Sequence, residues 1–256
     1  MFEIVYYDIE GTGTNSKQKQ EGIGIISIGA VTASGNEFKT FMLPTVPISE
    51  SATAVHGMTV QHGKLIDKNG QEIATESPDI GLKNFLDFLE NSNCKYLVAH
   101  NNFKYDWHVL KKNLQKFKIK NSIIDQLIPI DSQLFIEEEF HYWPCEDFSV
   151  KNCLKEICNE ERIESEAHDA LNDAKSAKQI CEQGAQKLNF KDFLDYITRK
   201  EELHAKPNAR FGMGHPEFRD FRISRNFNPE TKTYYIDGLR PTRGIRTGAI
   251  PSLFSR

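Results

Sequence analysis

Two acidic side chains stand close together near the start of the chain, where a strand-like run over residues 2–7 ends. Asp8 and Glu10 are separated by a single residue, Ile9. Because successive strand residues point to opposite faces, the two carboxylates share one face and Ile9 points to the other. Such a pair can bind a cation, although an Asp-x-Glu sequence also occurs at exposed strand ends that have no function.

Two further aspartates occupy positions where a helix would present apolar side chains. In a helix expected over residues 102–116, Asp106 lies at the edge of an apolar stripe, which is formed by Phe103, Trp107, Leu110 and Leu114. In a helix expected over residues 169–187, Asp173 lies within an inward stripe whose other members are Ala170, Ala177, Ile180 and Cys181. Burying an ionised carboxylate is unfavourable unless a cation compensates it. The alternative is a helix-capping role or an ion pair, for which Lys104, Lys175 and Lys178 are near enough in sequence.

Four carboxylates from separate segments could therefore meet and bind metal ions. Carboxylate oxygens are hard ligands, and the predicted site contains no cluster of Cys and His, so Mg²⁺ or Mn²⁺ fits better than zinc. Two such ions about 4 Å apart are a known arrangement for in-line displacement at phosphorus. The sequence predicts two divalent cations held by Asp8, Glu10, Asp106 and Asp173.

A histidine precedes the last of these predicted helices. His168 stands five residues before Asp173, outside the helix, so a loop would bring it to the same site. An imidazole has a pKa near neutral and can accept a proton from water at physiological pH. A lone histidine is more often an ordinary surface residue, but beside metal-binding carboxylates His168 is the candidate general base.

The order of predicted strands and helices sets the fold class. The strand before Asp8 is followed by two β-rich runs about a turn at residues 34–36, which predict a hairpin. A polar, loop-like stretch holds residues 56–59, and a helix is expected from Pro78. The remaining segments predict a strand over 95–99, a strand and turn over 122–135, and a helix over 148–158. Strands interleaved with helices after an initial hairpin predict an α/β fold, in which helices flank a mixed sheet.

Composition excludes several protein classes. The 256 residues are 39% hydrophobic and 27% charged, with a mean hydropathy of −0.52, as expected for one soluble domain with an appendage. No apolar run approaches the roughly 20 residues of a membrane helix, and the first residues lack the basic start of a secretory signal. Five cysteines, without a CxxC pair, argue against a disulfide framework and favour a reducing, cytoplasmic location.

Charge is divided unevenly along the chain. Residues 203–256 contain 10 basic and 4 acidic residues, whereas the part before them contains 22 basic and 32 acidic residues. A basic stretch with aromatic side chains would attract nucleic acid. Its arginines and phenylalanines include Arg210, Arg219, Arg222, Arg225, Arg240, Arg243, Arg246, Phe211, Phe218, Phe221 and Phe227. The alternative is a solvated tail, or a patch that packs on the acidic domain, with a two-stranded ribbon expected around residues 228–229.

A second set of metal-ligand residue types consists of His141, Cys145, Cys153 and Cys158. Their spacing matches no zinc pattern. Cys153 and Cys158 are five residues apart on an expected helix, so they face different ways. A zinc site is therefore disfavoured.

Taken together, three segments resemble the motifs of a known enzyme family. The segments YYDIEGTG, LVAHNNFKYDWHVL and AHDALNDAKSA resemble the three motifs of the DEDDh 3′-to-5′ exonucleases. Carried over motif by motif, Asp8 and Glu10 match the first, Asp106 the second, and His168 with Asp173 the third.

The resemblance covers roughly residues 3–187 and implies a ribonuclease-H-like fold. We therefore expect an exonuclease domain over residues 1–190 and a basic extension over 191–256. The spacing from His100 to Asp106 looks most like that of the three-prime repair exonucleases, which favours DNA over RNA as the substrate. Such an enzyme would bind two divalent ions and release nucleoside 5′-monophosphates from a 3′ end. The alternatives are an exoribonuclease of the same family and a catalytically silent module that binds nucleic acid.

The resemblance also implies a role for each acidic residue. Asp8 would bridge both ions, Glu10 and Asp173 would complete the shell of one, and Asp106 would support the other. His168 would deprotonate the attacking water. The candidate substrate-binding residues are Gly11, Thr12, Gly13, His56, Met58 and Asn101.

Two features stay open at this point. Thr14-Asn15 follows the glycine turn, where related repair exonucleases often carry an apolar residue that wedges against the terminal bases. The repair exonucleases form a homodimer through the edge of the opening hairpin, so the resemblance makes a homodimer one expectation for this chain.

Overall fold

A computed structural model of the chain describes residues 2–13, 22–140, 147–161, 167–205, 226–228 and 233–235. The chain divides into two units, residues 1–219 and 220–256, which are described separately. No helix within the described residues is long and apolar enough to cross a membrane.

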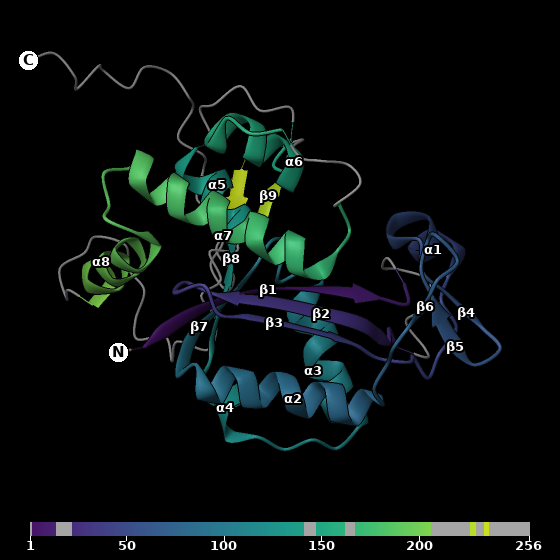
Figure 1. Cartoon of the computed structure of the whole chain (residues 1–256). Coiled ribbons are helices and arrows are strands. Elements are labelled where there is room, and N and C mark those ends of the chain that lie inside the picture. Colours follow the sequence, from purple (N-terminus) through teal and green to yellow (C-terminus); the bar gives the residue numbers. More distant parts are fainter. Residues whose placement is uncertain are drawn as a thin grey trace, which may run out of the picture. The chain divides into compact units, whose positions relative to one another are not determined.

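A five-stranded mixed sheet forms the centre of the first unit (Figure 1). Its strands lie in the order β3-β2-β1-β7-β8. The first three are antiparallel, whereas β7 runs parallel to both β1 and β8. Their bounds are β1 (Glu3–Gly11), β2 (Ile25–Thr32), β3 (Glu37–Phe41), β7 (Cys94–Ala99) and β8 (Ile128–Asp131). The predicted mixed sheet and opening hairpin are both confirmed.

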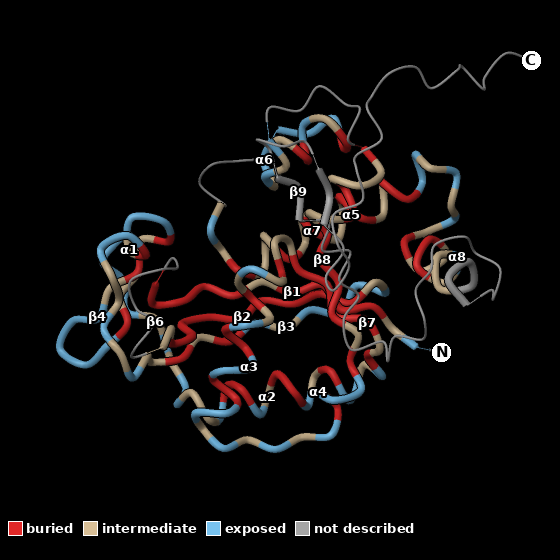
Figure 2. The backbone as a smooth tube through the Cα atoms, turned by 180° about the vertical axis from the view of Figure 1, so that it is seen from behind, coloured by how far each residue is buried: buried red, intermediate tan, exposed pale blue. Residues whose placement is uncertain are grey.

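Helices cover both faces of this sheet (Figures 1 and 2). Ile4 and Tyr6 of β1 belong to the core on one face, while Val5 and Tyr7 belong to the core on the other, as strand alternation requires. The first face is covered by α5 (Ser132–Glu139), α6 (Val150–Cys153), the π-helical turn η1 (Leu154–Cys158), α7 (Ala170–Lys187) and α8 (Phe193–Ala205). The second is covered by α2 (Pro78–Asn91), α3 (Asp106–Lys116) and α4 (Ser122–Gln126).

Two segments differ from the sequence-based expectation. The stretch expected to be a loop around residues 56–59 contains α1 (Glu50–His56), which Ser49 caps and which ends at Gly57 with φ 74°. It is followed by a small sheet of β4 (Thr59–Gln61), β5 (Lys64–Ile66) and β6 (Glu72–Ile73). The strand and turn expected over 122–135 are instead α4, β8 and α5. Polar caps explain the difference, because Asn121 accepts from the Ile123 N–H and Asp131 caps α5.

The helix expected over 102–116 begins four residues later, at Asp106. Asn101 has φ 62°, in the left-handed region, and a series of turns occupies residues 101–105. Phe103 therefore lies before the helix and is not part of its apolar stripe.

The second unit is described only at β9 (Asn226–Asn228) and β10 (Thr233–Tyr235), which pair antiparallel. The tail residues singled out for nucleic-acid binding lie outside the described residues, apart from Phe227, whose side chain is not described. The boundary at residue 190 stays a prediction. Helix α8 follows it, and Phe193, Tyr196 and Ile197 of that helix are buried together with residues of α7.

Four of the five cysteines lie in the described part of the chain, and all four are free and buried. Burial raises the pKa of the Cys94 thiol to about 12. Cys153 and Cys158 pack in the core cluster on the α7 side of the sheet. The two remaining residues of the disfavoured zinc set, His141 and Cys145, lie outside the described residues.

Candidate active site

The site begins at the second half of β1, where one edge of the strand is not covered by β7. The register between these parallel strands ends at Tyr6 opposite Val98, and β7 ends at Ala99. Beyond this point the backbone of β1 is open to another partner. The Ile9 N–H donates to Asp106 Oδ1 at 3.0 Å. The short neighbouring strand thus lets a carboxylate from another segment bind the edge of β1.

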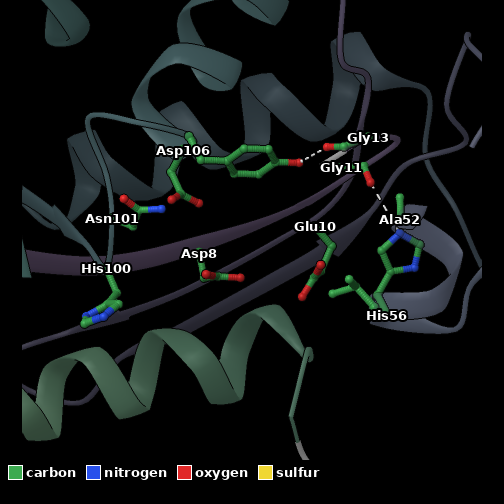
Figure 3. Close-up of a pocket in the computed structure, with 11 residues that line it drawn as sticks. Asp8, Glu10, Gly11, Gly13, Ala52, His56, His100, Asn101 and Asp106 are labelled. Carbon is green, nitrogen blue, oxygen red and sulfur yellow. Dashed lines mark hydrogen bonds between the residues drawn. The ribbon is translucent and has the colours of Figure 1, made fainter. Parts of the chain in front are cut away.

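Asp8 and Glu10 lie on the face of β1 that looks toward α7, as predicted from their spacing (Figure 3). Glu10 is buried, with 8% of its surface exposed, and Asp8 is half-buried. Both line a pocket together with Asp106. Three carboxylates from β1 and α3 therefore share one cavity.

Asp106 is fully buried, and not merely at the edge of an apolar stripe as predicted. Only 3% of it is exposed. Burial raises its pKa well above the usual range, and the negative charge of Asp8 raises it further, against the opposing effect of the Ile9 hydrogen bond. The ionised form of Asp106 therefore calls for a compensating positive charge.

The turns that carry Asp106 are braced from β8. The Asp131 carboxylate accepts the N–H groups of Asn101 at 3.0 Å and Phe103 at 3.1 Å, and it also caps α5. Asn102 is completely buried and accepts from the Tyr7 hydroxyl at 2.7 Å. These bonds fix the backbone immediately before Asp106, so its carboxylate arrives at the pocket in a defined position.

Helix α7 brings the third motif to the same place. Asp169 caps the helix through the N–H groups of Leu171 and Asn172. His168 precedes the cap, with φ 60°, and its N–H donates to Asp173 Oδ2 at 3.2 Å. Asp173 is half-buried in the first helical turn, while the buried stripe of α7 passes through Ala174. Asp173 lies three residues after buried Ala170 and four before buried Ala177, so it shares the inward face of α7, as predicted.

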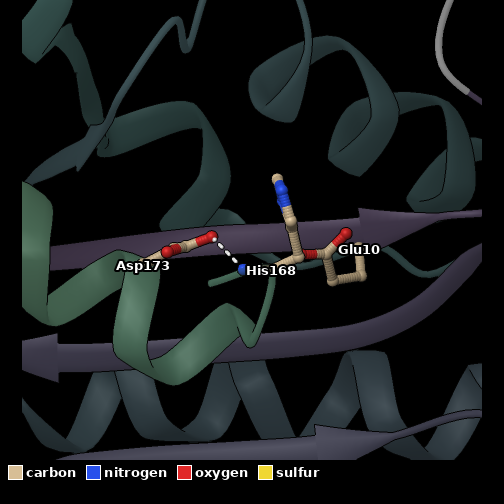
Figure 4. A group of neighbouring side chains, drawn as sticks. All are labelled: Glu10, His168 and Asp173. Atoms are coloured by element: carbon tan, nitrogen blue, oxygen red, sulfur yellow. Dashed lines mark hydrogen bonds between the residues drawn. The ribbon is translucent and has the colours of Figure 1, made fainter. Parts of the chain in front are cut away.

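Glu10, His168 and Asp173 form a compact cluster (Figure 4). One ligand atom from each residue lies within 4.8 Å of the others, which suits a shared cation. Their donor set of two carboxylates and one imidazole, beside the carboxylates of Asp8 and Asp106, fits hard divalent cations such as Mg²⁺ or Mn²⁺.

Two of the three lysines near these aspartates in sequence have other partners. Lys175 Nζ lies 2.8 Å from Glu37 Oε1. Lys178 Nζ donates to the carbonyls of Thr32 and Ala33 at 3.0 and 2.8 Å. Both lysines tie α7 to the β2–β3 hairpin, away from the carboxylate cluster.

A tyrosine braces the glycine turn that follows Glu10. The Tyr105 hydroxyl donates to the Gly13 carbonyl at 2.8 Å. A Cβ at Gly11 would collide with this hydroxyl and with Ile23, so glycine is required there by packing. Burial raises the pKa of Tyr105, which keeps its hydroxyl protonated as a donor.

His56 closes the pocket from α1. Its Nδ1 accepts the Met58 N–H at 3.0 Å, so its Nε2 carries the proton and donates to the Gly11 carbonyl at 3.3 Å. Burial lowers the pKa of His56, and nearby His168 lowers it further, which favours the neutral ring. The last turn of α1 also supplies Val55, an exposed apolar side chain at 41%, to the pocket wall.

Most of the predicted site residues come together, but two do not. Gly11, Gly13, His56 and Asn101 line the pocket with the carboxylates. Thr12 is buried, and its hydroxyl accepts the Gly24 N–H at 2.9 Å, so its side chain supports the turn from the interior. Met58 is 6% exposed and packs with Ile26 and Leu65.

Four residues of the pocket wall were not predicted from the sequence: Ala52, Val55, His100 and Tyr105. Tyr105 directly precedes Asp106 in the second motif, and this position could have indicated that it lines the pocket. His100 was noted only for its spacing; its ring atoms bond Ser132 Oγ at 3.0 Å and the Phe148 carbonyl at 2.7 Å. Ala52 and Val55 carry no sequence signal, because α1 itself was not predicted.

Comparisons with known proteins agree with this architecture. Residues 5–181 match the protein-family model described as an exonuclease. Among solved structures, the chain is similar to the nuclease domain of 3′hExo, a DEDDh family member bound to rAMP. The sequence identity is 15%, the TM-score is 0.53, and the match covers 72% of this chain and 92% of that one. At this identity the likeness shows a shared fold. No curated protein sequence matches the chain significantly.

Proposed function

Because residues 5–181 match its family model, the chain belongs to the exonuclease family, and we propose that it is a DEDDh member that hydrolyses nucleic acid stepwise from the 3′ end. The products are nucleoside 5′-monophosphates, and the favoured substrate is single-stranded or 3′-ended DNA. The observation that supports this proposal most strongly is the convergence of three sequence motifs. Glu10, His168 and Asp173 share one cluster, and Glu10 shares a pocket with Asp8 and Asp106.

The carboxylates are the proposed metal-binding residues. Asp8, Glu10 and Asp173 would hold one or both of two divalent cations, and Asp106 would support the second from the edge of β1. Such ions, when bound, neutralise charge at phosphorus and lower the pKa of water. The raised pKa of Asp106 supports this assignment, since a buried carboxylate beside another one is poorly stabilised without a cation.

His168 is the proposed general base. Its ring is exposed, so water can reach it, and its backbone N–H bonds Asp173, which keeps the imidazole next to the carboxylates. In the proposed step this imidazole accepts the proton of the water that attacks phosphorus. His56 would not compete for this role, because both of its ring nitrogens are occupied and it is buried.

The proposed binding place for the terminal nucleotide is the wall formed by α1 and the glycine turn. Val55, which is 41% exposed, presents apolar surface at the pocket, against which a base or sugar can pack. Gly13 also lines the pocket, whereas the space beside Gly11 is filled by the Tyr105 hydroxyl and Ile23. Asn101 lies on the opposite side with a polar side chain (Figure 3).

DNA is favoured by the spacing of the second motif, and RNA is the alternative substrate. The similar nuclease domain of 3′hExo was solved with rAMP, a ribonucleotide, which favours testing both. Discrimination depends on how the site treats the 2′-hydroxyl.

The test is incubation of the purified chain with matched DNA and RNA oligonucleotides labelled at the 5′ end, in Mg²⁺, Mn²⁺ or chelator. We expect a ladder of products that shorten one nucleotide at a time, faster on DNA, and no cleavage in chelator. Asp173→Asn is the inactive control and Asp87→Asn, an exposed carboxylate on α2, is the active one. A wild-type chain that binds the oligonucleotides and leaves them intact with either metal would favour the catalytically silent module.

Two broader predictions accompany this proposal. The first is that the extension over residues 191–256 adds affinity for nucleic acid to the domain over 1–190. The second is a homodimer through the edge of the hairpin. This prediction is supported by the position of β3, which lies at the edge of the described sheet. Sedimentation at increasing protein concentration tests the second prediction.

A further inference from the structure

Two ion pairs join the edge strand β3 to the first half of α7. Lys39 Nζ lies 2.5 Å from Asp169 Oδ2, and Glu37 Oε1 lies 2.8 Å from Lys175 Nζ. Lys39 and Glu37 are two residues apart on the strand, so they share a face. The two pairs have opposite orientation: β3 supplies the cation in one and the anion in the other.

The sheet register aligns the first of these pairs with the catalytic cluster. Asp8 lies opposite Gly29 in the β1–β2 pair, and Gly29 lies opposite Lys39 in the β2–β3 pair. One row of residues therefore runs across three strands, from a proposed metal ligand at one end to Lys39 at the other.

The beginning of α7 rests on the middle of this row. A Cβ at Gly29 would collide with the backbone of Ala170 and Leu171, so the first helical turn lies directly on the sheet there. From this point Asp169 extends toward Lys39 on β3. His168 and Asp173 reach the opposite way, to Glu10 on β1.

Asp169 uses its two oxygens for different partners. Oδ1 caps the helix through the N–H groups of Leu171 and Asn172, both at 3.2 Å, and Oδ2 binds Lys39. The next residue toward the N-terminus is His168, which is exposed and has a left-handed backbone. A non-glycine residue in this conformation is held there by its surroundings. Asp169, which follows His168 directly in the chain, is thus anchored by its carboxylate both to helix α7 and to strand β3.

From this geometry we propose that Lys39 is a positioning residue for His168. Its ion pair with Asp169 fixes the turn before α7, so that the imidazole stays beside Glu10 and Asp173. The inference rests on the proposed function, in which His168 is the base. Lys39 itself lies over the Phe41 ring, 5.0 Å from the centroid, which restrains the lysine on its strand.

The experiment compares Lys39→Met with Lys175→Met, its matched control. Each variant removes one ion pair between β3 and α7, but only the first pair includes the neighbour of His168. Steady-state kinetics on a 5′-labelled DNA oligonucleotide should show kcat lowered about threefold to tenfold by Lys39→Met, with KM within about twofold. Lys175→Met should change kcat less than about twofold. Lys39→Arg, which keeps the charge, should restore most of kcat.

A second measurement does not depend on activity. In a ¹H–¹³C spectrum of the histidine rings, the His168 signal, assigned with His168→Ala, should shift in Lys39→Met and keep its position in Lys175→Met. Both pairs are partly exposed, so we expect the melting temperatures of the two variants to lie within about 3 °C of the wild type.

Three outcomes would overturn the inference. The first is an unchanged His168 signal with unchanged kcat in Lys39→Met. The second is a raised KM with unchanged kcat, which would make Lys39 a substrate contact. The third is an equal loss of kcat in both variants, which would make the pairs merely structural. A wild-type chain without nuclease activity would instead refute the proposed function, and the ring spectra would still decide whether Lys39 holds His168.

Discussion

The Asp106→Asn variant should be more stable than the wild type without divalent ions. With divalent ions present, it should be less stable than the wild type. Asn keeps the shape of the side chain and an oxygen that can accept the Ile9 N–H. It removes a negative charge from a position that is 3% exposed and faces the charge of Asp8. Without metal, the wild type bears the unfavourable free energy of that charge and the variant does not.

The size of the effect follows from burial. An uncompensated buried polar group costs roughly 1–3 kcal/mol, and for a domain of this size 1 kcal/mol corresponds to about 2–4 °C in melting temperature. We therefore expect Asp106→Asn to melt about 2–12 °C higher than the wild type in chelator. An ion present at about 100 times its Kd stabilises the wild type by about 2.7 kcal/mol. The order of the two melting temperatures should then reverse, because the variant binds the ion weakly.

The pH dependence has a definite sign. The pKa of Asp106 is raised above its ordinary value of 3.8, so the folded wild type holds this proton to higher pH than the unfolded chain does. The stability contributed by the protonated form is complete at acidic pH and is lost as pH rises through the raised pKa. In chelator, the advantage of Asp106→Asn should therefore grow as pH rises above the ordinary value of 3.8, and level off once the raised pKa is passed.

Thermal melts in chelator and in a Mg²⁺ or Mn²⁺ series measure all three effects, with Asp87→Asn as the control for a surface carboxylate. This control should follow the wild type in every condition. The reasoning would be refuted if Asp106→Asn melted lower than the wild type in chelator. It would equally be refuted if the metal raised both melting temperatures by the same amount, since Asp106 would then play no part in binding it.

Three further predictions address the base, the glycine turn and the tail. His168→Ala should lower kcat roughly 100- to 10,000-fold in the oligonucleotide assay, because it removes the proton acceptor. The control, His108→Ala at an exposed position on α3, should leave kcat unchanged. A loss of twofold or less in His168→Ala would show that His168 is not the general base. Tyr105→Phe removes the hydrogen bond to Gly13, worth about 0.5–1.5 kcal/mol, and should raise KM about threefold while kcat changes less; an unchanged KM would show that the turn does not touch substrate. Deleting residues from 207 onward should weaken DNA binding and reduce the salt dependence of the affinity. Fluorescence anisotropy of a labelled DNA at two salt concentrations measures both. Unchanged affinity and salt dependence would show that the tail has no role in binding.

The sequence was sufficient for those parts of the site that depend on local periodicity. Asp8 and Glu10 share a face because a strand alternates, although the strand predicted over residues 2–7 continues to Gly11 and so contains both acids. The last helix begins after Asp169, as predicted, because a carboxylate before a helical run is a strong N-terminal signal.

The parts that were missed depend on residues distant in sequence. The second-motif helix begins at Asp106 because Asp131, from the end of another strand, binds the N–H groups of the preceding turn. No local pattern contains that information. Thr12 and Met58 lie in segments that reach the pocket, but their side chains point into the interior. The Thr12 hydroxyl accepts the Gly24 N–H, and Met58 packs with Ile26 and Leu65.

One topological feature makes the whole site possible, and it is the short length of β7. If β7 continued parallel to β1 past Ala99, its backbone would take the N–H of Ile9, and Asp106 would have no place on that edge. The strand instead ends, and the chain turns through residues 101–105 before α3 begins. The carboxylates thus gather where the regular sheet is interrupted, and their mutual repulsion is an unfavourable contribution that divalent cations can reverse. The same arrangement that lowers the stability of the metal-free fold would suit it to bind the proposed cations.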